Sequence, residues 1–317
     1  MGLSDDSSSQ QPPAASRVML KPGDTLEIGT KSEDLVPTDD PDLARKQVAA
    51  YPDNPEASFI LAVALTRTSR VEEALQEVRR ARKLADARGG PAYFDKMIAS
   101  YEKMLQTCPK DNRIRYGLAW AYYMKAYLLA KHSRRAAQAP AAAANPAATA
   151  ATAVAAPAAP APTAATAVAA PAAPAPTAST AVAAAPKPYN AFELAAAAAS
   201  GTADPSRLPQ LKGALERAEP SAVPQIKKYY ELALARLDEL LAQKPEDIWA
   251  RVYRAFLKAE YTGNLDEAMA TWKRCQEQHP DNPAPYFFLG EGYLKQGNLK
   301  ECINNVSKAI ALRAQGK

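Results

Sequence analysis

The sequence predicts an all-α fold, an α-solenoid of stacked helical hairpins interrupted by a disordered Ala/Pro-rich insert. Three features predict it: an internal repeat, a proline–asparagine signal that recurs between helices, and a break in composition near the middle of the chain. We expect four segments, which are a disordered leader at 1–39, N-terminal helical repeats at 40–135, the insert at 136–204, and C-terminal helical repeats at 205–317.

The internal repeat is clearest near the C-terminus. Gly263–Ala268 (GNLDEA) returns as Gly297–Cys302 (GNLKEC), an offset of 34 residues. The turn sequence HPDNP at 279–283 has a counterpart, YPDNP, at 51–55. In both turns the first proline ends a helix and the asparagine caps the next one. The second proline takes the first helical position, where its missing N–H costs nothing.

The order of elements follows from composition and apolar spacing. Residues 1–39 are polar and contain several prolines, which is typical of a disordered leader. Helical periodicity begins near Asp42. Further helices are expected at 91–107, 112–132 and 224–243, and two complete repeat units near 249–282 and 283–313.

The insert separates two helices that belong together. Helix 112–132 opens like the first helix of a repeat but has no partner before the insert, so we expect it to pair with helix 224–243. Within the insert, TAVAAPAAPAPT occurs at 152–163 and again at 166–177. Frequent proline and the absence of large apolar residues predict an unfolded tether. Residues 191–199 are expected to add a short helix.

These repeats resemble the tetratricopeptide repeat (TPR) family, whose unit is a helix–turn–helix of 34 residues. In the last unit, the family's large residues fall on Tyr286, Leu289 and Tyr293, and Gly290 supplies the small residue between close helices. The second helix continues the pattern with Cys302, Val306 and Ala309. The unit from 249 fits as well, except that Phe256 stands where the family has a small residue.

The resemblance implies a partner-binding surface on the concave face, lined by the first helix of each hairpin. Carried over by position, the predicted partner-binding residues are Phe59, Val63, Tyr116, Trp120, Tyr123, Tyr253, Leu257, Tyr261, Phe287 and Leu294. Many are aromatic, and aromatic residues are favoured at interfaces. The alternative is that several pack against a neighbouring helix. These side chains predict an apolar or amphipathic protein or peptide ligand rather than an acidic C-terminal tail.

Motifs for other functions are missing from the sequence. There is no phosphate-binding glycine loop, no GxSxG elbow and no HExxH pair. Cys108, Cys275 and Cys302 are not at metal-ligand spacing. The net charge of +5 is spread along the chain, so we expect no nucleic-acid ligand. We also expect no catalytic residue, metal, cofactor or membrane span, and a cytoplasmic location.

The sequence therefore predicts a non-catalytic protein–protein interaction scaffold or adaptor. Two alternatives remain open. The chain could be a regulatory or docking component of an enzyme system with an unrecognised catalytic site, or a self-assembling structural protein.

Overall fold

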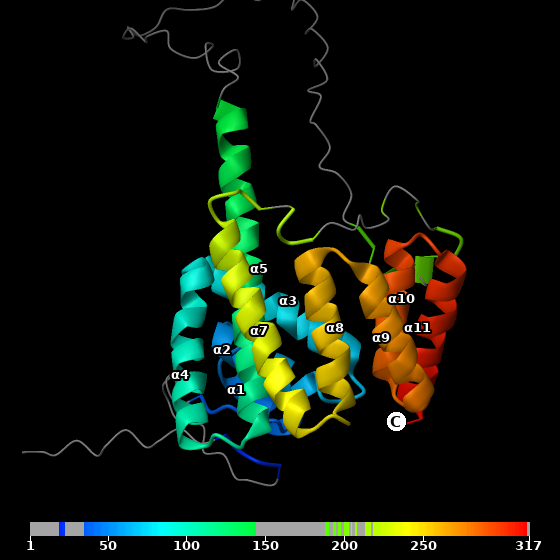
Figure 1. Cartoon of the computed structure of the whole chain (residues 1–317), viewed down its shortest axis with the longest axis horizontal. Coiled ribbons are helices and arrows are strands. Elements are labelled where there is room, and N and C mark those ends of the chain that lie inside the picture. Colours follow the sequence, from blue (N-terminus) through cyan, green and yellow to red (C-terminus); the bar gives the residue numbers. More distant parts are fainter. Residues whose placement is uncertain are drawn as a thin grey trace, which may run out of the picture.

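The computed structural model is all-α, as the sequence predicts (Figure 1). It describes residues 19–22, 35–143, parts of 188–219 and all of 220–315, without the side chains of 136–143. In this part of the chain there is no strand, and an isolated backbone bridge joins Leu20 to Thr38. The tandem repeats of the insert lie outside the described residues.

Consecutive helices pack on one another along most of the chain. The N-terminal helices are α1 (Pro41–Ala50), α2 (Pro55–Leu65), α3 (Val71–Ala87), the 3₁₀ turn η2 (Gly90–Ala92), α4 (Tyr93–Thr107) and α5 (Asn112–Ala143). The C-terminal helices are α7 (Val223–Gln243), α8 (Ile248–Thr262), α9 (Leu265–Gln278), α10 (Pro283–Lys295) and α11 (Leu299–Ala314).

The predicted proline–asparagine signals begin helices as expected. The Asn54 side chain accepts a hydrogen bond from the Glu56 N–H at 2.8 Å, and the Asn282 side chain accepts one from the Ala284 N–H at 2.9 Å. A proline follows each asparagine at the start of α2 and α10. These side chains satisfy N–H groups that the first turn of a helix leaves without a partner.

Helices α5 and α7 pair across the insert, which confirms the predicted pairing. Tyr122 lies 6.1 Å from Tyr229 between ring centroids, and Tyr123 lies 6.0 Å from Tyr230. Helix α5 runs on to Ala143 rather than ending at 132, and it extends beyond its neighbours (Figure 1). The residues added are mostly alanine, the strongest helix former.

Part of the predicted leader packs against the helices, which differs from the disorder expected for 1–39. Met19 and Leu35 are buried. The side-chain amide of the buried Gln47 in α1 makes two hydrogen bonds to the backbone of Val36. It accepts from the Val36 N–H at 2.8 Å and donates to the Val36 carbonyl at 2.9 Å. Arg113 of α5 donates to the Leu20 carbonyl. No sequence pattern indicates this packing, because single polar side chains make these contacts.

The end of the predicted insert also packs against the fold. Tyr189 and Leu194 are buried with Leu294, Cys302 and Val306 of α10 and α11. Residues 193–194 and 196–197 are helical, as expected for a short helix in 191–199. This segment therefore covers the last hairpin, although it precedes α7 in the chain.

An ion cluster ties the end of α3 to α5. Asp86, whose side chain is 11% exposed, accepts from Lys131 at 2.8 Å, from Arg135 at 3.2 Å and from His132. Burial raises the pKa of Asp86, but the hydrogen bonds from Lys131 and His132 outweigh it, and the pKa falls to about 2. The carboxylate is therefore ionised in the folded protein throughout the neutral range.

Because folding lowers the pKa of Asp86, its contribution to stability should be present above pH 4 and should disappear as the pH falls towards 2. We expect Asp86→Asn to lower the free energy of unfolding by about 2 kcal/mol at pH 7. Urea unfolding of both proteins between pH 7 and pH 3 should show this gap narrowing below pH 4. A gap that stays constant over this range would contradict the ionised pairing.

Gly290 allows α10 and α11 to approach closely, as the repeat pattern predicts. A Cβ at this position would lie 2.6 Å from Cγ2 of Val306 and 3.4 Å from the Cys302 carbonyl oxygen. Val306 is fully buried, so it has little room to move.

We expect Gly290→Ala to lower the free energy of unfolding by about 1–2 kcal/mol, because overpacking outweighs the gain in helix propensity. Urea denaturation would measure this. The double variant Gly290→Ala/Val306→Ala removes the clashing methyl group, so Gly290→Ala should cost less in the Val306→Ala background than in the wild type. Equal costs in the two backgrounds would rule out this contact as the cause.

Candidate functional site

The predicted partner-binding residues lie mainly in the protein core. Nine of the ten are at most 3% exposed: Phe59, Val63, Tyr116, Trp120, Tyr123, Tyr253, Leu257, Phe287 and Leu294. The tenth, Tyr261, is partly buried and stacks on Tyr230 at 5.1 Å between centroids. Contact of these residues with a partner therefore stays a prediction. In the structure, other helices of the same chain pack against them.

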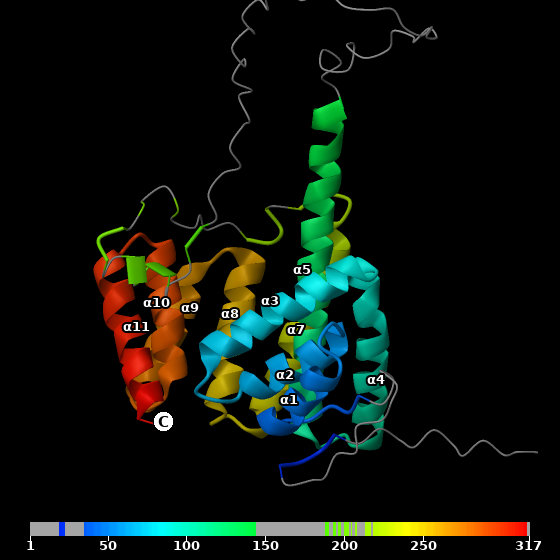
Figure 2. The same ribbon diagram turned by 180° about the vertical axis from the view of Figure 1, so that it is seen from behind.

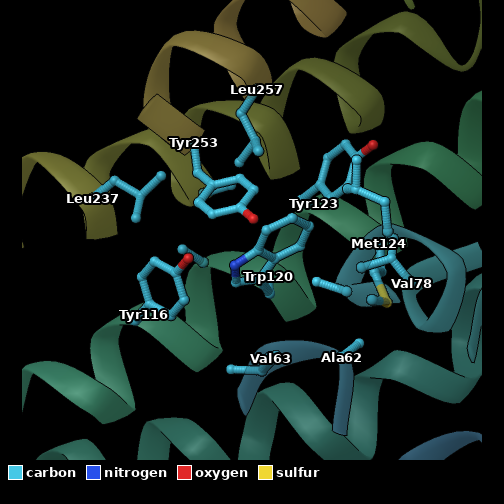
Figure 3. Packing of buried hydrophobic residues seen from close by; sticks show 14 of the residues in the cluster. Ala62, Val63, Val78, Tyr116, Trp120, Tyr123, Met124, Leu237, Tyr253 and Leu257 are labelled. Atoms are coloured by element: carbon cyan, nitrogen blue, oxygen red, sulfur yellow. The ribbon is translucent and has the colours of Figure 1, made fainter. Parts of the chain in front are cut away.

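Trp120 of α5 lies between the N-terminal and C-terminal helices (Figure 3). Its ring is 5.1 Å from that of Tyr253 in α8, and Ala62 and Val63 of α2 lie on its other side. All four residues are buried. The aromatic face of α5 is thus covered within the chain, by α2 on one side of Trp120 and by α8 on the other.

Helix α3 extends this cover along the C-terminal helices. In Figure 2 it crosses in front of α5 and α8, and it contacts α5 and α10. Arg82 of α3 lies over the Tyr127 ring of α5, 3.7 Å from guanidinium carbon to centroid. In the loop before α3, Arg67 pairs with Asp247 ahead of α8 at 2.8 Å.

Two other predicted partner-binding residues, Phe59 and Leu294, lie in separate parts of the structure. Phe59 packs edge-to-face on Phe94 and Tyr101 of α4, with centroids at 6.2 and 5.9 Å. Leu294 belongs to the cluster covered by Tyr189. The ten residues therefore do not form one continuous exposed surface.

An open groove does remain where α3 meets the last hairpin. We call it the seam groove, and its volume is about 380 Å³. Its lining is mainly apolar and includes Val71, Pro283, Phe287, Ala309 and Ile310. Among the described residues, Ile310 is the one large hydrophobic side chain that is classed as exposed, at 48%.

Charged and polar groups lie beside the seam groove. Glu72 of α3 and Arg313 of α11 line it and approach to 3.8 Å. A more polar cleft of about 480 Å³ shares Ser69 and Pro283 with the groove and continues it towards Trp249. The surface beside the seam groove is therefore apolar at the α11 end and polar towards Trp249.

Sequence reasoning missed Ile310 because α11 has its core residues elsewhere. Cys302, Val306 and Ala309 follow the helical spacing of a buried stripe. Ile310 falls outside that stripe, on the helical face that also carries the partly buried Ile303 seven residues earlier. This pair of isoleucines was the available signal, although single exposed apolar residues are common.

A second opening, which we call the α3 cleft, lies between α3 and the aromatic faces of α8, α9 and α10. Its volume is about 220 Å³. Tyr123 and Phe256 line it together with Val78 of α3. Of the predicted residues, Tyr123 borders this cleft and Phe287 borders the seam groove.

The buried cysteines are poorly suited to nucleophilic chemistry. Burial raises the pKa of Cys275, and burial followed by the charge of Glu291 raises the pKa of Cys302 to about 12. Both thiols are therefore protonated at neutral pH, whereas a reactive cysteine needs the thiolate form.

No group of three or more His, Cys, Asp or Glu side chains in the described residues could hold a metal ion. No helix in that part of the chain is both long and apolar enough to cross a bilayer. No protein-family model matches the sequence, and no curated protein is detectably similar to it.

The core position of Trp120 gives a prediction about stability. We expect Trp120→Ala to lower the free energy of unfolding by about 3–5 kcal/mol, as for other large-to-small core changes. The effect of Tyr253→Phe on the free energy of unfolding should be different. Its hydroxyl is buried and has no hydrogen-bond partner among the described residues, so its removal should be neutral or stabilising.

Urea denaturation of both variants would test this pair. A loss above 1 kcal/mol in Tyr253→Phe would show that the hydroxyl makes a bond that the structure does not contain. A cost under 1 kcal/mol for Trp120→Ala would place the indole outside the core.

Proposed function

We propose that this chain is a non-catalytic scaffold of the TPR type, an α-solenoid that binds a protein partner. The seam groove carries the proposal, because Ile310 is 48% exposed beside a concave lining of buried apolar side chains, and such a groove accepts an apolar anchor from a partner. Buried, protonated thiols support the non-catalytic part of it.

The repeat architecture is supported by details of the helical hairpins. The 34-residue repeat coincides with the pairs α8–α9 and α10–α11, each of which packs closely. Gly263 and Gly297 occupy equivalent turns and have φ of 75° and 74°, a conformation that favours glycine. Two turns of the same shape, one repeat apart, are what stacked identical units require.

The partner should present an apolar side chain to the groove. Val71, Phe287 and Ile310 offer apolar contacts, while Glu72 and Arg313 flank them with one charge of each sign. An amphipathic helix or extended peptide with one apolar anchor matches this arrangement, because burial of the anchor supplies most of the affinity. The predicted aromatic set then stabilises the scaffold, and Phe287 contributes to the groove.

The experiment compares Ile310→Asp with Ser307→Asp. Both changes add one negative charge to an exposed position of α11, but Ser307 does not line the groove. Affinity purification with quantitative mass spectrometry would identify partners of the wild type. We expect Ile310→Asp to weaken the specific partner by more than about tenfold and Ser307→Asp to leave it unchanged.

Thermal unfolding of both variants provides the control, since surface changes of this kind should alter stability by less than about 0.5 kcal/mol. Partners retained equally by both variants would place binding elsewhere. Light scattering over a concentration series separates the self-assembly alternative. If Ile310 joined two copies, the mass of the wild type would rise with concentration and that of Ile310→Asp would not.

A further inference from the structure

The α3 cleft has an aromatic floor and a charged rim. The floor contains Phe256, Trp272 and Phe288, and Trp272 stacks on Phe288 with centroids 5.4 Å apart and planes at 27°. The indole N–H of Trp272 already donates to the Val252 carbonyl at 3.1 Å. Trp272 and Phe288 are only 2% and 1% exposed, so the accessible aromatic surface of the floor comes from the partly buried Phe256, whose ring packs on Phe288 at 5.3 Å between centroids.

Arg82 at the rim is held in place without a counter-ion. Its guanidinium lies on the Tyr127 ring and donates weakly to the Tyr123 hydroxyl at 3.3 Å. Its Nε atom is buried and has no hydrogen-bond partner in the described part of the chain. No carboxylate among the described residues lies within ion-pair distance of Arg82. The guanidinium charge is therefore not balanced by an ion pair, and its Nε–H has no acceptor.

The remaining charges of the rim leave a positive excess. Lys295 pairs with Glu260 at 3.0 Å, so these two charges offset each other. Arg79, one helical turn before Arg82, is exposed and forms no ion pair within the described residues, and Glu291 is the other carboxylate of the lining. Two arginines thus face one carboxylate at the mouth of the cleft.

We propose that the α3 cleft binds a small amphipathic anion. A flat apolar body would lie against Phe256, whose ring packs on that of Phe288, and an anionic head would accept hydrogen bonds from Arg82, with Arg79 adding charge. Convergent polar groups over an apolar floor are the usual composition of small-molecule sites. At about 220 Å³ the cleft is too small for an α-helix, whose diameter with side chains is about 10 Å, so the ligand differs from the protein partner of the seam groove.

The test uses two fluorescent probes that share their rings. 8-Anilinonaphthalene-1-sulfonate carries an anionic sulfonate, and N-phenyl-1-naphthylamine is its neutral counterpart. Binding of each is measured by titration with the full chain, and energy transfer from tryptophan reports binding near the cleft, where Trp272 lies in the floor and Trp120 packs on Tyr123 of the lining. We expect one site per chain that binds the sulfonate at least tenfold more tightly than the neutral probe.

Arg82→Met removes the charge and keeps an unbranched apolar side chain to pack on Tyr127. It should weaken sulfonate binding at least tenfold and leave neutral-probe binding unchanged. Arg313→Met, which changes the seam groove instead, should affect neither probe. Circular dichroism would verify folding. If Arg82→Met does not fold, the exposed Arg79→Met should weaken the sulfonate about threefold.

Three results would overturn the proposal. The wild type could fail to bind the sulfonate, it could bind both probes equally, or the arginine variants of the cleft could bind the sulfonate as well as the wild type. The first result would show that the cleft does not bind such an anion. The other two would show that the cleft is a non-specific apolar surface. None of them bears on the protein partner of the seam groove, which is tested through Ile310.

Discussion

The packing of Trp120 between α2 and α8 is the contact on which the rest of the structure depends. It joins helices that are far apart in sequence, and the aromatic rings around it fill the centre of the molecule. Once α2 lies against this face, the short connection to α3 brings α3 across α5 and on to α10. The positions of both openings, the seam groove and the α3 cleft, follow from where α3 comes to lie.

Much of the helical order could be predicted because it depends on local chemistry. Asn54 and Asn282 cap helices through contacts within a few residues, and the small Gly290 is required by its own hairpin. The pairing of α5 with α7 across the insert was predictable from unmatched apolar faces. In each case the pattern identifies which side chains need cover.

The pattern of apolar residues does not identify which segment or partner packs against these side chains. Tyr253 and Leu257 have the same periodicity whether a partner or another helix of the chain lies against them, so the predicted binding surface includes much of the core. Gln47 holds the backbone of Val36, Arg113 holds that of Leu20 beside the buried Met19, and Leu294 is buried with Tyr189; all of these are tertiary contacts between distant segments. Such contacts leave no periodic signal, and the same holds for the groups that line the two openings.

The route of α3 also has a consequence for synthesis on the ribosome, where N-terminal segments emerge first. Val78 and Leu75 of α3 face residues of α8, α9 and α10, which leave the exit tunnel much later. Until then the nascent chain holds an apolar helical surface without its cover, and non-local contacts of this kind form slowly. Molecular chaperones would therefore act on this chain mainly before α10 has been translated.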